Sequence, residues 1–312
     1  GNFEVDYKIH GFEDLHLHAS LGAQYTSTQQ SDEISKYSYS NNYFGWAGMT
    51  HYWKYNMIGN AYAQYAHKFG VHDIDVMAGA EQSHYHRHGY NQGFGTDEYL
   101  KANNPVLNEE TGYYNWQHNP SKRSEQEWAN HNSLVSYFGR LNYNLLDRYL
   151  ITATFRADGS SRFAKGHKWG YFPSAAFAWK INNEGFLKDV KWLDDLKLRV
   201  GWGKTGQQNG IDDFYYAPLY VVGNSYAQYP FGNDYHQTVR PNKYNDQLTW
   251  EKTTTWNAGI DFAALNNRFS FNIDGYYRKT TDLLATVDVP AGTTFGDNLL
   301  KNVGSLKNYG VE

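Results

Sequence analysis

The sequence of 312 residues contains no cysteine, so it has neither a disulfide framework nor a thiolate metal site. It has no run of about 18 apolar residues, which excludes a membrane-spanning helix. Proline is limited to 7 residues. Lys and Arg number 28 against 32 Asp and Glu, and no basic block or stripe is present. Nucleic acid is therefore not an expected partner.

Aromatic residues are abundant and make up 18% of the chain. They favour pleated, half-buried strands. Apolar and polar residues alternate with a period of two, as where Ile151, Ala153 and Phe155 alternate with Thr152 and Thr154. The mean hydropathy of −0.75 does not exclude a membrane barrel, because each barrel strand needs only about 10 alternating residues. The pattern predicts an all-β protein.

We predict ten strands and a partial eleventh from this alternation. They are placed near residues 3–10, 15–25, 54–68, 73–86, 133–144, 148–158, 168–181, 196–204, 250–263 and 268–280, with the partial strand in 299–312. The connections between them alternate in length. Short ones at 11–14, 69–72, 145–147 and 264–267 separate long ones at 26–53, 87–132, 159–167 and 205–249.

This alternation of short and long connections predicts an antiparallel up-and-down transmembrane β-barrel, with short periplasmic turns and long extracellular loops. A soluble sandwich shows the same period of two along its strands. Aromatic residues at the strand ends, typical of membrane interfaces, favour the barrel. They are Tyr137, Tyr143, Tyr149, Tyr171, Trp179, Trp202, Trp250 and Trp256. The connection 182–195 is too long for a tight turn, and we expect a helical piece around Phe186–Leu193.

Several long segments occur in a distinctive order. They are LVSYFGRLNYNLLDRYLITATFRADGSSRF (134–163), WGYFPSAAFAW (169–179), LKLRVGWGKTGQQ (196–208), LTWEKTTTWNAGIDFAALNNRFSFNIDGYYRKTTDLL (248–284) and NVGSLKNYGVE (302–312). In sequence, order and spacing they resemble the SusC/RagA family of TonB-dependent outer-membrane transporters. Residues 1–133 resemble that family more loosely.

The resemblance implies a barrel of roughly 22 strands, of which ten to eleven lie in this chain, around an N-terminal plug. By the same resemblance, residues 1–312 are an internal part of the barrel, and the plug domain, the TonB box and the C-terminal strands lie outside them. It also implies outer-membrane lipid around the barrel, a SusD-like surface lipoprotein, energy from TonB, and oligosaccharide or peptide cargo. The alternative is a secreted β-rich glycan-binding module or glycan-acting enzyme.

No catalytic constellation and no cofactor site emerge from the sequence. The run Gly-Trp-Gly-Lys-Thr-Gly at 201–206 matches a dinucleotide fingerprint only formally, because a loop sequence follows it where a helix is required. His84, His86 and His88 would share one face of a strand, as metal ligands could, although exposed histidines explain them as well. We predict no metal site and leave these three histidines open.

The long loops carry the candidate ligand-binding residues. Their aromatic rings stand among Asn, Gln and Asp, and such rings suit the apolar faces and hydroxyl rims of sugars. They equally suit contact with the lipoprotein partner, where Tyr and Trp are enriched, or packing of the loops against themselves. The candidates are Tyr113, Tyr114, Trp116, Trp128, Tyr215, Tyr216 and Tyr220.

Overall fold

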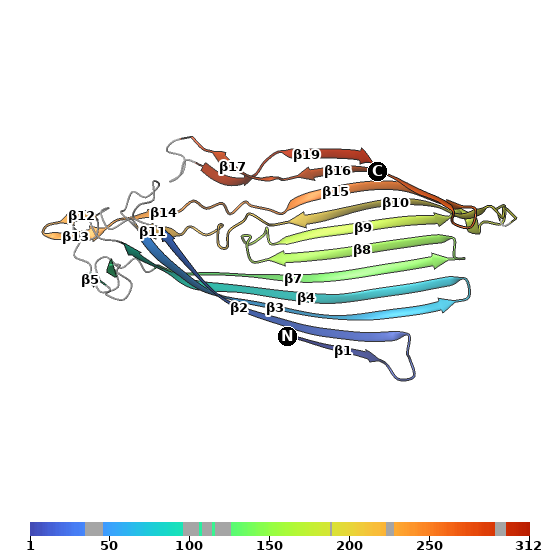
Figure 1. Ribbon diagram of the computed structural model, residues 1–312, viewed down its shortest axis with the longest axis horizontal. Coiled ribbons are helices and arrows are strands. Elements are labelled where there is room, and N and C mark those ends of the chain that lie inside the picture. The colour runs from blue at the N-terminus through green and yellow to red at the C-terminus, as the bar shows by residue number, and fades with distance from the viewer. Residues whose placement is uncertain are drawn as a thin grey trace. The chain divides into compact units, whose positions relative to one another are not determined.

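A computed structural model describes residues 1–34, 46–95, 106–107, 114–115, 126–187, 189–222, 228–290 and 298–312. Nearly all regular structure in these ranges is strand (Figure 1). The only helical segment among them is the 3-10 turn η2 (Ile181–Asn183). Within the described part of the chain, no helix has the length and apolar character needed to cross a membrane.

Eleven strands follow one another in chain order through one antiparallel sheet. They are β1 (Asn2–Lys8), β2 (Leu15–Ile34), β3 (Trp46–Phe69), β4 (His72–Gly95), β7 (Gln126–Leu145), β8 (Tyr149–Ser160), β9 (Trp169–Lys180), β10 (Leu193–Gln207), β15 (Glu251–Ala264), β16 (Phe269–Thr281) and β19 (Ser305–Val311). Each is hydrogen-bonded to its predecessor, as expected of an up-and-down barrel wall. The sequence-based prediction of strand number and order is confirmed.

Short strands lie within the long connections. β5 (Val106–Leu107) and β6 (Tyr114–Asn115) pair with each other, and β6 also pairs with β4. The connection after β10 holds two pairs, β11 (Tyr220–Val222) with β14 (Val239–Pro241), and β12 (Gln228–Phe231) with β13 (Asp234–Gln237). The connection after β16 holds the hairpin of β17 (Leu284–Asp288) and β18 (Asn298–Asn302).

Two of the long loops, 26–53 and 87–132, were predicted too long. β2 runs on to Ile34, β3 begins at Trp46, and β4 and β7 extend to Gly95 and from Gln126. The extensions mix aromatic, histidine and amide side chains without a regular apolar alternation, so the period of two fades there. Their ladder hydrogen bonds need only a neighbouring strand, not an apolar face, and the strands therefore continue beyond the hydropathy signal.

The chain forms two compact units. The first comprises residues 1–2, 21–58 and 83–132, and the second comprises 3–20, 59–82 and 133–312. The long strands β2, β3, β4 and β7 each contribute one part to each unit. The first unit thus contains the strand extensions, and the second contains the sheet from β8 to β19.

The sheet of the second unit has one apolar and one polar face. Leu198 lies opposite Ile260, which lies opposite Ile273 on the next strand. Side chains of this kind are well exposed, as shown by the 51% exposure of Phe155 and Ile273. The intervening residues carry charge, for example Arg199 and Asp261. An exposed apolar face opposite a charged one is the reverse of a soluble sandwich, which buries its apolar face.

Tight turns join the strands at one end. Leu146 and Asp147 have φ values of 58° and 51°, and Asn266 and Asn267 have values of 60° and 58°. Such left-handed pairs match the twist of the flanking strands, and Asn and Asp tolerate this region better than most residues. These two turns agree with the short connections predicted at 145–147 and 264–267.

The connection between β9 and β10 is ordered around Glu184 rather than around a helix. The Tyr149 hydroxyl and Trp179 Nε1 donate to Glu184 Oε1 at 2.6 and 2.9 Å, and Arg148 Nη1 donates to Oε2 at 3.0 Å. These contacts, that of Tyr149 first, hold the pKa of Glu184 below its ordinary value of 4.5. The helical piece predicted around Phe186–Leu193 is wrong for the described residues there, which form turns.

Replacing Glu184 by Gln should lower the unfolding midpoint of the full-length barrel at neutral pH. Because the folded-state pKa is lowered, the carboxylate stabilises the fold above its unfolded-state pKa and loses this effect as pH falls through the folded-state pKa. The difference between wild type and Glu184→Gln should therefore shrink at pH below about 4.5. Asp189→Asn, at an exposed position of the same connection, serves as the control. If the difference in unfolding midpoint between wild type and Glu184→Gln were the same at acid and neutral pH, this prediction would be contradicted.

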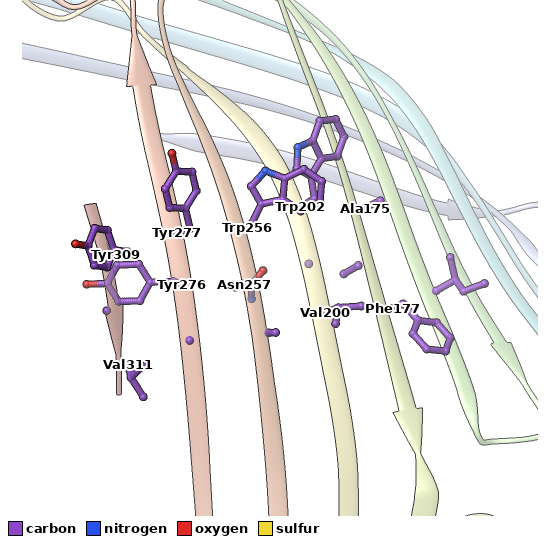
Figure 2. A pocket seen from close by; sticks show the side chains of 16 residues that line it. Ala175, Phe177, Val200, Trp202, Trp256, Asn257, Tyr276, Tyr277, Tyr309 and Val311 are labelled. Carbon is purple, nitrogen blue, oxygen red and sulfur yellow. The ribbon is translucent and has the colours of Figure 1, made fainter. Parts of the chain in front are cut away.

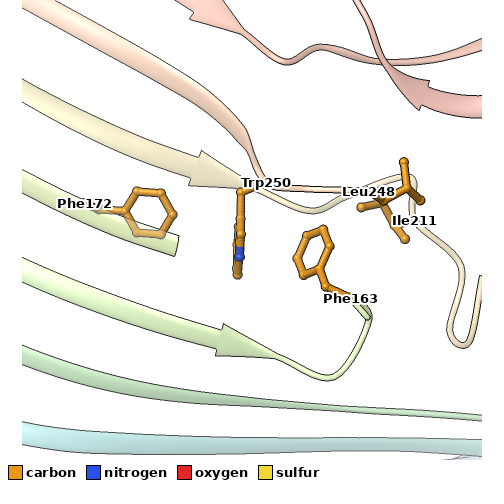
Figure 3. Close-up of a cluster of buried hydrophobic side chains, with 5 residues drawn as sticks. All are labelled: Phe163, Phe172, Ile211, Leu248 and Trp250. Carbon is orange, nitrogen blue, oxygen red and sulfur yellow. The ribbon is translucent and has the colours of Figure 1, made fainter. Parts of the chain in front are cut away.

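A small buried cluster closes the end of the second unit opposite the tight turns. It consists of Phe163, Phe172, Ile211, Leu248 and Trp250 (Figure 3). Trp250 is 5% exposed, its Nε1 donates to Lys168 O at 3.0 Å, and its ring lies 5.2 Å from that of Phe163. Trp250 is therefore not an interface residue, which corrects that prediction.

Gly206 makes room for this cluster. A Cβ at Gly206 would collide with the ring of Phe172, and all three glycines of the 201–206 run lie inside β10. The run is thus a strand with close neighbours and lacks the helix N-terminus that a dinucleotide site requires.

Trp250→Ala should destabilise the full-length barrel by about 3–5 kcal/mol, as expected for a large buried aromatic side chain. Urea unfolding in detergent measures the effect. Trp192→Ala, at a position that is 55% exposed, should cost much less. Equal losses in the two variants would show that the cluster does not hold the connections together.

Candidate cargo-contact site

Ion pairs cross the polar face of the second unit. Arg199 Nη2 lies 2.7 Å from Asp261 Oδ1 and 2.9 Å from Asp274 Oδ2, which joins β10, β15 and β16. Arg156 Nη2 lies 2.8 Å from Glu81 Oε1, and its Nε lies 2.7 Å from Asp158 Oδ1. Each of these half-buried arginines is paired with carboxylates, so the charges in this part of the face are neutralised.

The apolar face of the same unit carries a row of rings. Trp202 lies opposite Trp256, Trp256 opposite Tyr277, and Tyr277 opposite Tyr309. Beside this row lies a hollow of about 930 Å³ that also borders Val200 (Figure 2). Amphipathic rings in a band across an exposed apolar sheet are the arrangement found at membrane interfaces.

In the first unit, three side chains from three strands stack together. The guanidinium carbon of Arg87 lies 4.2 Å from the ring centre of Tyr52 and 4.5 Å from that of Trp128. Lys54 Nζ lies 5.1 Å from the same Tyr52 ring. Rings that flank a guanidinium attract it through their electron-rich faces. We call Tyr52, Arg87 and Trp128 the aromatic clamp.

Gly89 permits the clamp to form. A Cβ there would lie 2.6 Å from Tyr52 Cβ and 2.9 Å from Trp128 Cζ2, closer than real contacts allow. Gly79 of β4 lies against Tyr62 of β3 in the same way. Gly79 precedes Gly89 by ten residues, and Tyr62 follows Tyr52 by ten residues. The register is therefore unbroken, and Arg87 shares its face of β4 with Glu81, the partner of Arg156. The clamp lies on the polar face.

The opposite face of these extensions carries histidines. His88 stacks on Trp53 with ring centres 4.9 Å apart, and His86 lies 5.4 Å from His88. Among the described residues, the group that brings three possible metal-ligand atoms within 4.8 Å of one another is Glu4, Asp6 and His18. His18 Nδ1 lies 2.9 Å from Asp6 Oδ1, and a hydrogen bond accounts for that approach. His84, His86 and His88 do not form such a group.

The seven predicted contact residues have separate locations. Tyr113 and Trp116 lie outside the described residues, and Tyr114 lies in β6. Trp128 belongs to the clamp. Tyr215 packs against the buried cluster, and its hydroxyl accepts a hydrogen bond from Leu300 N at 3.0 Å, which favours loop packing for this residue.

Tyr216 and Tyr220 remain near Tyr215 in sequence but differ in exposure. Tyr216 is half-buried in a turn, whereas Tyr220 is 69% exposed at the start of β11. Sequence reasoning missed Tyr52, Lys54 and Arg87. Tyr52 lies at the end of the predicted loop 26–53, Lys54 begins the predicted strand 54–68, and Arg87 follows the predicted strand 73–86. The sequence pattern therefore gave no reason to group these residues with Trp128.

An antiparallel sheet in chain order, with an exposed apolar face, a ring row and an ion-paired polar face, is the wall of a membrane β-barrel. The family model described as TonB dependent receptor-like, beta-barrel, matches residues 1–312. The chain belongs to this family of outer-membrane transport proteins, which are not enzymes. The enzyme and soluble-module alternatives are thereby excluded.

Relatives of known sequence agree. The TonB-dependent receptor SusC of Bacteroides thetaiotaomicron is 53% identical over 312 residues, which is 100% of this chain and 30% of that protein. The TonB-dependent receptor P26 of Formosa agariphila is 37% identical over 213 residues, 66% of this chain and 20% of that protein. The chain thus spans less than a third of the length of these relatives.

Solved structures agree as well. The RagAB peptide transporter matches with a TM-score of 0.77 and 26% identity over 95% of this chain and 31% of that one. The RagAB peptide importer in its 'open-open' state matches with a TM-score of 0.78 and 26% identity, over 99% and 32%. The suspected SusC/RagA relationship and the barrel fold are confirmed.

The two faces of β8 give a matched pair of substitutions. Ala153 lies on the apolar face and Thr154, its neighbour, on the polar face. Ala153→Arg should cost about 2–4 kcal/mol in barrel stability, because it places a charge against lipid, whereas Thr154→Arg should cost little. Heat-modified mobility of the full-length barrel in gels reports assembly. Equal effects would reverse the assignment of the faces.

Proposed function

We propose that the full-length protein that contains this chain imports oligosaccharides across the outer membrane, energised by TonB and working with a SusD-like surface lipoprotein. The observation that carries the proposal is the 53% identity to SusC over the whole chain, within a family of outer-membrane receptors. Residues 1–312 are then part of its barrel, with the plug domain, the TonB box and further strands elsewhere in the protein.

The aromatic clamp supports a saccharide as the cargo. Tyr52 and Trp128 present flat apolar rings on the polar face, and a sugar offers C–H faces to such rings and hydroxyls to the Lys54 ammonium group. Peptide is the other cargo class, because RagAB is described as a peptide transporter. A bound peptide, however, gains most of its affinity when its backbone N–H and C=O groups pair with those of a strand edge. The strands that carry the clamp already use their own backbone groups in the sheet.

The long connections are the proposed extracellular side. In an up-and-down barrel every second connection lies at the same end, and the long ones alternate with the tight turns. Tyr114, Tyr216 and Tyr220, in the connections after β4 and β10, are proposed contacts for the cargo or for the lipoprotein, with Tyr113 and Trp116 outside the described residues.

Trp128→Ala in the full-length transporter should weaken binding of a neutral oligosaccharide such as maltohexaose by roughly tenfold, since stacked rings are worth about 1–3 kcal/mol in comparable sites. Calorimetry in the absence of the lipoprotein measures this. The matched control is Trp53→Ala, on the opposite face of β3, which should leave binding unchanged. Loss of binding in both variants, or in neither, would contradict a cargo role for the clamp.

A further inference from the structure

Arg87 differs from the other half-buried arginines of the polar face in what surrounds its charge. Arg156 and Arg199 each lie within 3.0 Å of two carboxylates. The Arg87 guanidinium carbon instead lies 4.2 and 4.5 Å from the ring centres of Tyr52 and Trp128, which are 6.1 Å from each other. No carboxylate side chain that the structure describes lies within ion-pair distance of it. Among these side chains, rings contact the charge and no acid neutralises it.

Two further features of this site concern the hydrogen bonds of Arg87 and the positive charge around it. The Nε atom of Arg87 is buried and has no hydrogen-bond partner among the described residues. A buried donor without a partner is costly, so the hydrogen bonds of this guanidinium are not all satisfied by described residues. Lys54 Nζ, near the same Tyr52 ring, adds a second positive charge. Two cations without a described acid therefore share one part of the wall, in a chain whose net charge is −4.

We propose that the aromatic clamp binds an anionic group of the cargo, so that the transporter takes acidic oligosaccharides. The inference rests on the proposed function and names the substrate class of the same site. The two rings contact the guanidinium, whose planar set of N–H groups can bind a carboxylate or sulfate in a bidentate manner. The rings then contact the sugar that carries the anion, while Lys54 adds attraction.

Packing alone is the competing explanation, and it makes a different prediction. If Arg87 only fills the space between Tyr52 and Trp128, its charge is immaterial to binding. The affinity for neutral and acidic sugars would then change together, or not at all, when the charge is removed. A comparison of sugars that differ only in charge therefore separates the two explanations.

The experiment measures binding of three oligosaccharides of equal length to the full-length transporter by calorimetry. One is neutral, one contains uronic acids and one is sulfated. The wild-type protein should bind at least one anionic sugar more tightly than the neutral one, and salt should reduce that preference. Arg87→Gln should weaken binding of the anionic sugar roughly ten- to a hundredfold and leave the neutral sugar unchanged.

Two further variants control for folding and for general charge. Arg140→Gln removes an exposed positive charge from the polar face of β7, opposite Thr154, and should change no affinity. Arg87→Lys keeps the charge but loses the planar fork, so it should retain the anion preference at reduced affinity. If Arg87→Gln does not assemble, Lys54→Gln, which removes the second positive charge near the Tyr52 ring, takes its place and should weaken binding of the anionic sugar alone.

The outcomes distinguish the inference from the proposed function. Equal binding of all three sugars by the wild type, or equal losses for neutral and anionic sugars in Arg87→Gln, would overturn the anionic-cargo assignment and leave saccharide import standing. Binding of none of the three sugars would remove the proposed function, and the inference with it. A preference for the uronic acid or for the sulfated sugar would identify which anion the clamp fits.

Discussion

The unbroken antiparallel hydrogen-bond ladder is the constraint on which the rest of this structure depends. Hydrocarbon offers no partners for backbone N–H and C=O groups, so a chain that crosses it as strands must pair every strand with a neighbour. Tight turns at one end and chain-order pairing satisfy this requirement with the shortest connections. In such a ladder successive side chains point to opposite faces, so the two faces can differ in their residue composition.

The two faces use that freedom differently. On the apolar face, small residues and rings are exposed, and a row of rings such as that from Trp202 to Tyr309 is typical of the level where lipid meets water. On the polar face, Arg199 with Asp261 and Asp274 ties three strands together. Paired charges of this kind tie neighbouring strands together, because a half-buried charge that loses its partner is unfavourable.

The proposed cargo site differs from this arrangement of paired charges. In the first unit, the Arg87 guanidinium contacts the rings of Tyr52 and Trp128, and no carboxylate side chain that the structure describes is paired with it. A single glycine, Gly89, makes the close approach of Tyr52 and Trp128 sterically allowed. The site is thus built by the register of three strands, not by a local motif.

The sequence by itself determined the fold class, the chain-order pairing and the two-faced strands, since a period of two along β8 or β10 is a property of neighbouring residues. It also placed Trp128 among the candidate contacts. Only the tertiary structure decided that Trp250 is buried, that Tyr215 packs against the core, and that Arg87 joins Tyr52 and Trp128. Those facts depend on which residues face each other across strands. Cross-strand register is set by turns and ladders far from the residues concerned, and one sequence does not record it locally.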